Sequence, residues 1–379
     1  MTVLRERSTL DGVQPNGESS DAVEHLRRIL RKALDVEASD VHLKPGAPPA
    51  LRVDGELQVL DATPLGRELV ESATMGLAAG AALDPAFILR KQCDFGCDVD
   101  GIGRLRCHAY RTGGRLALSI RMVKSPIPDL GALRLPPVIK RIALAERGLV
   151  LVTGPQGTGR TTTIASMLQF VNTQATRHVV TLEDPIEFRF DDRQSRFSQR
   201  EIGRDVDSVV AGLDGAMRED ADIVFVGALQ TQQEMELALT VAESGRLVVS
   251  TMHTVGAPRT VQRISGLFPP QQRDSVRRRL ADAVAGMVSQ RLVPLRNSRR
   301  RVLVTEVLTP SPNVLDCIRE ERRLKALHAA METNTTEHGS HTFDQRLLTM
   351  AREGLITIDT AQAVANNPAH LVRSLNIVR

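Results

Sequence analysis

Apolar residues near the start of the chain fall at helical spacing. From Asp21 onward they recur every three or four positions, as they do on the buried face of an amphipathic helix. Asp21 and Glu24 have the spacing of a capping box, so we predict that a first helix begins at Asp21. Residues 1–20 are polar, contain Gly, Ser and Pro without periodicity, and are predicted to be a disordered leader.

Short apolar-rich segments and turn dipeptides follow. Residues 51–53 and 56–60 flank Asp54-Gly55, whose tolerance of positive φ favours a tight hairpin. Further on, an antiparallel meander is predicted for three segments that are separated by Gly-containing turns, residues 93–99, 104–110 and 115–122. We therefore expect a first domain that spans residues 21–123.

The segment 124–137 contains four prolines and is predicted to be an interdomain linker. Beyond it, β-rich apolar runs alternate with helical segments, which indicates a parallel sheet covered by helices. These runs are residues 149–153, 179–182, 223–226 and 247–251. A long amphipathic helix is then predicted from the apolar face formed by Val276, Leu280, Ala283, Val284, Met287 and Val288. An apolar run, 302–308, and a helical C-terminal region complete a second domain over residues 138–375, so the predicted fold class is α/β.

Composition narrows the functional classes. No segment approaches the ~20 consecutive apolar residues of a membrane span, and the N-terminal residues lack the apolar run of a signal peptide, so we expect a cytoplasmic protein. A net charge of +4 permits acidic partners without selecting among them. Aromatic residues make up only 3% of the chain, which argues against base stacking on single-stranded nucleic acid.

The four cysteines show no metal-ligand spacing. They contain no C-x-x-C pair, and they are Cys93, Cys97, Cys107 and Cys317. Neither a zinc site nor a disulfide framework is indicated. We expect reduced thiols.

A glycine-rich loop between an apolar strand and an apolar helix is the most informative segment. Residues 154–161 match the phosphate-loop spacing G-x-x-x-x-G-K-[ST], except that Arg160 occupies the lysine position. Backbone N–H groups of such a loop, with the following helix N-terminus, hold phosphate oxygens. The predicted nucleotide-binding residues are Gly154, Pro155, Gln156, Gly157, Thr158, Gly159, Arg160, Thr161 and Thr162. The alternative is a flexible turn between a strand and a helix.

Arg160 keeps the positive charge of the usual lysine but not its geometry, because a guanidinium is longer, planar and bulkier than an ammonium. The hydroxyl of Thr161, the next residue, would be offered to Mg²⁺.

Residues that act on a bound phosphate should follow the parallel strands at the same sheet edge as the loop. Glu183 follows one strand and is a candidate for holding a Mg²⁺-bound water, although an acid there could also cap a loop. Another strand ends in Gly227-Ala228, where a catalytic carboxylate is expected, and an alanine cannot orient water or accept a proton. His253 follows a third strand, where it would polarise the terminal phosphate or serve a structural role.

Several segments resemble the PilT-like branch of the type II/type IV secretion ATPases, over residues 21–373. In the first domain these are ASDVHL, LRVDGEL and GRLRCHAY, at 38–43, 51–57 and 103–110. In the second domain TLEDPIEF at 181–188 resembles the Asp box, MREDADIVFVG at 217–227 the Walker B region, and STMHT at 250–254 the His box. QREIG at 199–203 and HTFDQ at 341–345 also fit.

This resemblance implies a PAS-like N-terminal α+β domain and a RecA-like P-loop NTPase domain with a helical C-terminal region. It implies a six-membered ring that binds ATP or ADP with Mg²⁺ between subunits. Three arginines of the first domain would then reach toward the nucleotide: Arg104, Arg106 and Arg121. Without the family they would be read as surface charges on strands. The lack of a tetracysteine zinc site favours the retraction-type branch.

The departures from the family pattern matter equally. Arg160 stands for the Walker A lysine, Ala228 for the Walker B glutamate, and Leu229-Gln230-Thr231 for Met-Arg-Asp. The segment NVLDCIRE, at 313–320, matches the retraction-associated motif only in its second half.

The leading hypothesis is therefore an accessory or regulatory paralogue whose ATP hydrolysis is impaired or absent. Its expected partners are further copies of itself or an active PilT-like paralogue, and a pilus platform protein at the inner membrane, where peripheral attachment is an open alternative. A second hypothesis is a slow retraction ATPase that uses Glu183. A third is a RecA-like nucleic-acid-binding protein, suggested by the basic clusters 277–279 and 299–301, although nucleic acid is not among the expected partners.

Overall fold

The computed structural model describes residues 17–81, 83, 92–123, 126–298 and 300–376. The chain divides into two compact units. Unit 1 contains Met1–Pro126 together with the short segment Asp184–Phe188, and unit 2 contains Ile127–Glu183 and Arg189–Arg379.

Unit 1 is a six-stranded antiparallel sheet whose strand order is β3-β2-β1-β6-β5-β4. Its strands are β1 (Asp40–Leu43), β2 (Ala50–Val53), β3 (Glu56–Val59), β4 (Gln92–Val99), β5 (Gly103–Thr112) and β6 (Arg115–Met122). Helices α1 (Gly17–Asp35) and α2 (Arg67–Gly80) supply apolar residues to a core shared with one sheet face. Val41 and its partner Ile120 point into this core, whereas the adjacent pair Asp40 and Arg121 lies on the other face.

The sequence predicted the turns of unit 1 well. Asp54 and Gly55 have φ values of 50° and 90°, as the predicted hairpin between β2 and β3 requires, and the meander β4-β5-β6 is confirmed. Helix α1 begins at Gly17 instead of Asp21, so residues 17–20 are helical and the predicted capping box does not mark its start. The remainder of the predicted leader, residues 1–16, lies outside the described residues.

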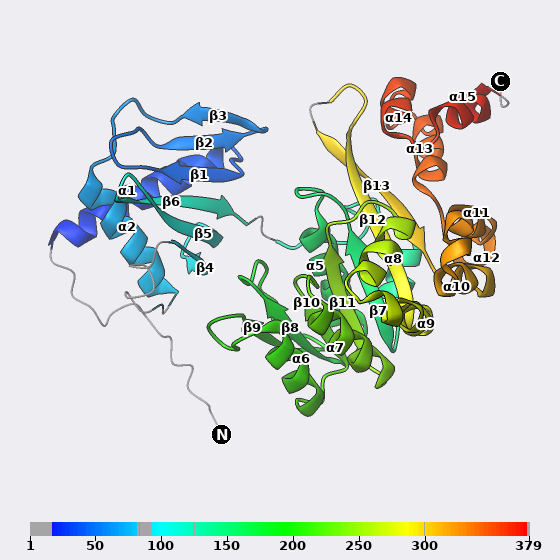
Figure 1. Ribbon diagram of the computed structural model, residues 1–379. Coiled ribbons are helices and arrows are strands. Elements are labelled where there is room, and N and C mark those ends of the chain that lie inside the picture. Colours follow the sequence, from blue (N-terminus) through cyan, green and yellow to red (C-terminus); the bar gives the residue numbers. More distant parts are fainter. Residues whose placement is uncertain (1–16, 82, 84–91, 124–125, 299, 377–379) are drawn as a thin grey trace. The chain divides into compact units, whose positions relative to one another are not determined.

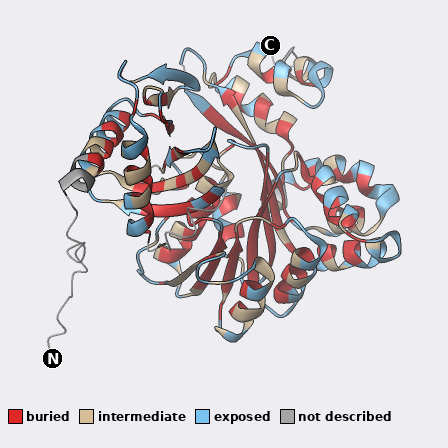
Figure 2. Ribbon diagram, turned by 60° about the vertical axis from the view of Figure 1, so that its left-hand side comes forward, coloured by how far each residue is buried: buried red, intermediate tan, exposed pale blue. Residues whose placement is uncertain are grey.

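Unit 2 is a seven-stranded sheet in the order β13-β12-β7-β11-β10-β8-β9. Its strands are β7 (Gly148–Thr153), β8 (His178–Glu183), β9 (Arg196–Glu201), β10 (Ile223–Val226), β11 (Leu247–Met252), β12 (Val284–Pro294) and β13 (Arg301–Leu308). Neighbouring strands are parallel, except that β13 runs antiparallel to β12. Figure 2 shows the central strands of this sheet as buried and the outward sides of the surrounding helices as exposed.

Helices cover both faces of this sheet. Alternate residues of β7 accordingly belong to two different apolar cores. Leu149 and Leu151 belong to one apolar cluster, and Val150 and Val152 to another. The helices are α4 (Val138–Ala143), α5 (Arg160–Gln174), α6 (Val209–Arg218), α7 (Gln232–Glu243), α8 (Ala257–Gly266), α9 (Arg273–Ala283), α10 (Pro312–Arg319), α11 (Leu327–Thr333), α12 (Thr335–His338), α13 (Phe343–Arg352), α14 (Ile358–Val364) and α15 (Pro368–Asn376). Short 3₁₀ helices occupy Pro270–Gln272 and Glu321–Ala326.

The C-terminal region is helical, as predicted. Helices α13, α14 and α15 pack around a small apolar cluster with the outer parts of β12 and β13 (Figure 1). None of the helices in the described ranges combines the length and apolar character needed to cross a lipid bilayer.

Two predictions about unit 2 are wrong. The apolar residues from Val276 to Val288 do not form one helix: α9 ends at Ala283, and Val284 begins β12. A strand buried on both faces is continuously apolar, so its residues also satisfy helical spacing. Part of the predicted linker is packed instead of free, because Leu130 is 4% exposed and lies in a core cluster with Ile139. Residues from Ile127 onward therefore belong to unit 2.

Candidate functional site

The glycine-rich loop lies between β7 and α5 in the conformation that its glycines require. Gly154 has a φ of 152°, and a Cβ there would come 2.7 Å from the carbonyl oxygen of Gln290 and 2.7 Å from Oγ1 of Thr158. Gly157 and Gly159 have φ values of 78° and 83°. The hydroxyl of Thr158 donates to the carbonyl of Pro155 at 2.8 Å, which closes the loop on itself. The loop is therefore an ordered cradle at the start of α5, where the first N–H groups of the helix have no intrahelical acceptor.

Strand β12 holds both ends of this loop. The hydroxyls of Thr153 and Ser289 are 2.8 Å apart, and the Nε2 group of Gln290 donates to Oγ1 of Thr163 at 2.7 Å. All four side chains are buried. Ser289 and Gln290 were not predicted as site residues; they directly follow the segment from Val276 to Val288 that was expected to be helical. A buried amide in an otherwise apolar run was the signal that could have identified Gln290.

The tips of β8, β10 and β11 lie at the same edge of the sheet as the loop. In the strand register Met252 is paired with Thr153, and Val226 is paired with both Ser250 and Leu182. The residues that directly follow these strands therefore share the carboxyl edge at which ligands of such sheets bind.

At this edge β10 ends at Val226 and is followed by Gly227 and Ala228, while Glu183 ends the neighbouring β8. The Gly227 N–H donates to the carbonyl of Leu182 at 2.9 Å, so the two strand tips are in contact. Glu183 is 5% exposed, and its Oε1 accepts from Oγ1 of Thr181 at 2.8 Å and from Nε2 of Gln199 at 3.5 Å. The hydrogen-bonded carboxylate of Glu183 therefore lies at the end of the strand next to the one that Gly227 and Ala228 follow.

His253 follows β11 and is exposed to solvent. Partial burial lowers the pKa of this imidazole below its ordinary value, and the nearby guanidinium of Arg160 lowers the pKa further. Both effects favour the neutral ring at neutral pH. His253 and Arg160 are therefore close enough for their charges to interact.

The three arginines predicted from the family resemblance lie in unit 1, and their hydrogen-bond and ion-pair partners lie in the same unit. Arg104 is 7% exposed; its Nε and Nη2 donate to the carbonyl of Ile186 at 3.1 and 3.0 Å, and its Nη1 lies 2.8 Å from Asp98. Arg106 pairs with Glu187 at 2.8 Å, and Arg121 pairs with Asp40 at 2.9 Å. These contacts are internal to unit 1, and the approach of the arginines to a nucleotide stays a prediction.

The cysteines have structural positions. Cys93, Cys97 and Cys107 are buried in β4 and β5, Cys317 is buried in α10, and all four are free thiols. Burial raises the pKa of the Cys93 and Cys317 thiols, so these side chains behave as small apolar groups in their cores.

A buried parallel sheet with a phosphate-type loop after a central strand defines a RecA-like P-loop NTPase domain. The family model described as "Type II/IV secretion system protein" matches residues 134–364, and the chain belongs to this family, in its PilT-like branch. The chain is 33% identical over 343 residues to the type IV pilus retraction ATPase PilT of Pseudomonas aeruginosa, covering 90% of this chain and 98% of that protein. It is 32% identical over 344 residues to the type IV pilus ATPase PilU of the same organism, covering 90% and 89%.

A solved structure gives the same relationship. The crystal structure of the pilus retraction motor PilT with bound ADP aligns with a TM-score of 0.81 and 35% identity, covering 91% of this chain and 98% of that one. The predicted two-part fold, an N-terminal α+β domain and a RecA-like domain with a helical C-terminal region, is confirmed.

Proposed function

We propose that this chain binds ATP or ADP at residues 154–162 as a component of a type IV pilus motor, and that it hydrolyses ATP slowly or not at all. One observation carries the proposal: the phosphate loop after β7 and the residues Gly227-Ala228 after β10 lie at the same edge of the sheet. The nucleotide assignment is supported by the ADP bound in the PilT structure to which this chain is similar.

Thr161 and Glu183 are suited to Mg²⁺. Thr161 lies in the first turn of α5, directly after the loop, and Glu183 is held at the sheet edge by Thr181. Mg²⁺ prefers oxygen ligands and retains several waters, so a threonine hydroxyl and a carboxylate-bound water fit its coordination. Bound Mg²⁺ would neutralise phosphate charge, while this chain's own loop amides and Arg160 would bind the phosphate oxygens.

The side chains at 160 and 228 limit catalysis. A missing general base typically costs ~10²–10⁴ in rate. Arg160 retains positive charge, but its forked guanidinium cannot take the position of a compact ammonium at the transferring phosphate. Binding therefore survives these two changes better than turnover does.

A slow genuine ATPase is the second candidate, and the position of Glu183 supports it. A Cβ added to Gly227 would lie 3.8 Å from the Cα of Glu183, so this acid is adjacent to the altered strand tip. Replacing Glu183 by Gln would abolish hydrolysis if Glu183 orients the water. The matched control is Asp184→Asn, since Asp184 is the next residue and is exposed.

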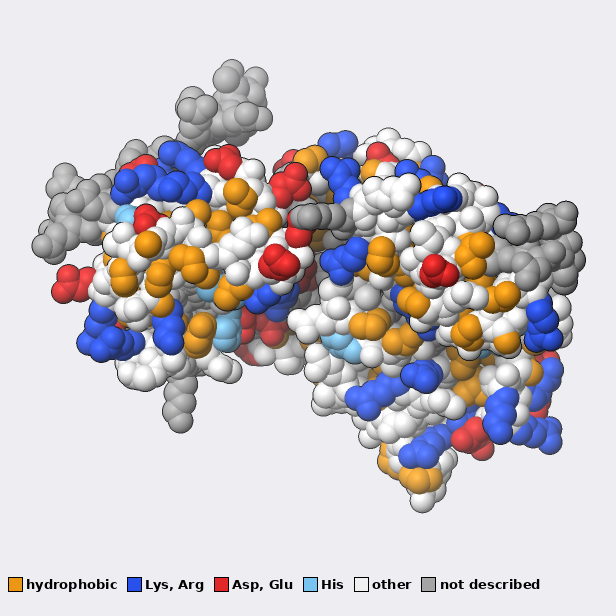
Figure 3. Space-filling model, turned by 90° about the horizontal axis from the view of Figure 1, so that it is seen from above, with side chains coloured by type: hydrophobic (Ala, Val, Ile, Leu, Met, Phe, Trp, Pro, Cys, Tyr) orange, Lys and Arg blue, Asp and Glu red, His pale blue; other side chains and the backbone are white. Residues whose placement is uncertain are grey.

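A nucleic-acid-binding role is not favoured. Arg277 lies 3.0 Å from Glu321 and also pairs with Asp274, and Arg279 lies 2.7 Å from Glu243 and also pairs with Glu236. On the face shown in Figure 3, basic side chains of unit 2 stand among acidic and hydrophobic ones. Residue 299, in the second predicted cluster, lies outside the described residues. Salt-sensitive binding to DNA or RNA would be needed to support this role.

The proposed assembly is a ring of six subunits, made of this chain alone or mixed with an active PilT-like paralogue, at the pilus platform of the inner membrane. In such a ring Arg104, Arg106 and Arg121 would reach toward the nucleotide. Mass photometry with and without ADP tests the ring. A sixfold mass is expected, and a monomer at every protein and nucleotide concentration would contradict the assembly.

The decisive test of the function measures ATP affinity and phosphate release on one purified preparation. We expect saturable binding with release far below that of an active relative measured in parallel. Release at the rate of the active relative, with Ala228 unaltered, would refute the proposal.

A further inference from the structure

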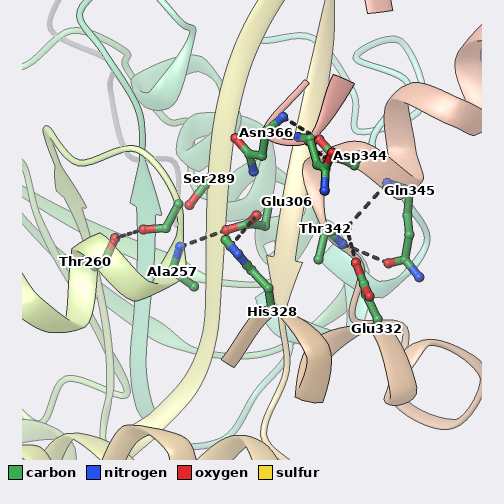
Figure 4. Close-up of polar contacts among 12 residues, drawn as sticks. Ala257, Thr260, Ser289, Glu306, His328, Glu332, Thr342, Asp344, Gln345 and Asn366 are labelled. Carbon is green, nitrogen blue, oxygen red and sulfur yellow. Dashed lines mark hydrogen bonds and ion pairs between the residues drawn. The ribbon is translucent and has the colours of Figure 1, made fainter. Parts of the chain in front are cut away.

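A buried carboxylate in β13 touches two helices of unit 2. Glu306 is 1% exposed. Its Oε1 accepts from the backbone N–H of Ala257 at 2.8 Å, and its Oε2 lies 3.2 Å from Nε2 of His328. Figure 4 shows the carboxylate between the Ala257 amide and the His328 ring. Glu306 therefore joins β13 to the first residue of α8 and to α11.

The backbone before α8 is shaped to admit this carboxylate. Gly256 has a φ of 89°, and a Cβ there would lie 3.3 Å from the Oε1 atom of Glu306. The first N–H groups of a helix have no intrahelical acceptor and carry partial positive charge, so a carboxylate at this point is stabilising. Gly256 thus leaves space for the Glu306 carboxylate, and the charge of Glu306 suits the helix N-terminus.

The anchored helix start is directly connected to the turn that bears His253. The hydroxyl of Thr260 donates to the carbonyl of Gly256 at 2.9 Å, and the hydroxyls of Thr254 and Thr260 are 2.7 Å apart. Thr254 follows His253 in sequence. A displacement of the α8 N-terminus would therefore move the histidine that lies near Arg160.

A buried carboxylate is costly unless a cation accompanies it. His328 is the basic partner of this carboxylate: the contact with Glu306 raises the pKa of the imidazole, burial opposes the rise, and Glu332 and Asp344 raise it further. The other charged or titratable side chains around this group are His341 beside Thr305, Arg291 on β12 and Arg259 on α8. Burial lowers the pKa of His341, so this second imidazole is neutral where His328 is charged.

We propose that Glu306 and His328 are positioning residues for the His253 turn: Glu306 fixes the N-terminus of α8, and His328 holds the Glu306 carboxylate from the α11 side. The expected effect on nucleotide affinity rests on the proposed nucleotide binding. The expected effect on the backbone of residues 253–260 is independent of it.

The sign of the pH dependence follows from the raised pKa of His328. The ion pair contributes fully below the ordinary histidine pKa of 6.5 and is lost as pH rises through the raised folded-state pKa. The α8 N-terminus is therefore expected to loosen at alkaline pH. A purely structural contact without a titrating partner would show no such change.

Hydrogen exchange of the full-length, nucleotide-free protein tests the backbone consequence, followed over about pH 6 to 9 with correction for intrinsic rates. In wild type, protection of residues 253–260 should fall with rising pH. Glu306→Gln should lower this protection by roughly tenfold at low pH. His328→Gln should remove its pH dependence. The matched control is Glu353→Gln, which removes an exposed carboxylate at the end of α13 and should behave as wild type.

ADP titration of the same variants separates this inference from the proposed function. We expect Glu306→Gln to weaken ADP binding by roughly 5-fold or more. If wild type binds no ADP while exchange responds as stated, the proposed function fails and the positioning role stands. If exchange at residues 253–260 is unchanged in both Glu306→Gln and His328→Gln, the positioning role is overturned whatever the ADP result.

Discussion

The hydroxyl of Thr251 donates to the carbonyl of Gly227 at 2.6 Å. This bond joins β11 to Gly227, the residue between the end of β10 and Ala228. The ends of the two strands therefore keep a fixed separation. The backbone next to Ala228 is therefore held against β11.

Thr251→Val should remove this bond and leave a polar carbonyl without that donor. We expect the free energy of unfolding to fall by about 1 kcal/mol, the usual worth of one such bond. Urea denaturation measures it. The control is Thr349→Val, at an exposed position of α13, which should change stability by less than ~0.5 kcal/mol. Equal losses of stability in the two variants would show that the Thr251–Gly227 hydrogen bond does not hold the two strands together.

Gly154→Ala should abolish nucleotide binding. The added Cβ would lie 2.7 Å from the Gln290 carbonyl oxygen, at a φ of 152° that other residues rarely adopt. The loop must move to relieve this contact, and its amides then lose their common direction. ADP titration checks the result. Gly66→Ala is the control, because nothing lies within 4 Å of a Cβ there. Wild-type affinity in Gly154→Ala would contradict the assigned loop.

Arg104→Ala should destabilise unit 1 by about 1–3 kcal/mol, because the Ile186 carbonyl loses its donors in a buried place. Arg121→Ala is the comparison: the Arg121 side chain is 53% exposed, so solvent screens its ion pair and the loss should be ~0–1 kcal/mol. Calorimetry or urea unfolding distinguishes the two. A larger loss of stability from Arg121→Ala would contradict the prediction that the buried Arg104 contributes more than Arg121.

His253 should titrate below its ordinary pKa of 6.5. A depressed folded-state pKa means that this group disfavours the folded state as pH falls below the ordinary value, and that the ring is neutral at pH near ~7. NMR of histidine-labelled protein measures the pKa. Arg160→Gln should raise it, because the second cause of the shift is removed. An unchanged His253 titration in that variant would show that the two side chains do not interact.

Local chemistry made much of this fold predictable. The Asp54-Gly55 turn requires positive φ, and the loop from Gly154 to Gly159 carries its own geometry in its glycines. Strand β12 was missed for a physical reason: a strand between β7 and β13 is apolar on both faces, so its spacing does not distinguish it from the helix α9 that precedes it.

The site was only partly predictable. The residues around the loop were located from the rule that ligands bind at the carboxyl ends of parallel strands. Gln290 and Glu306 were not located, because their roles depend on β12 pairing with the loop strand β7 and on β13 pairing with β12. A lone glutamate inside the apolar run of β13 was the available signal, since such a charge must have a partner when buried.

If Arg160 and Ala228 limit turnover while the loop still binds nucleotide, restoring a lysine and a glutamate at these positions should restore phosphate release. The most direct measurement is phosphate release by Arg160→Lys/Ala228→Glu against wild type, with Ala228→Gln as a control of similar size without a carboxylate. We expect the double variant to release phosphate ~10²–10⁴ times faster than wild type, with ATP affinity changed far less. Equal release by wild type and the double variant, both saturated with ATP, would contradict the account.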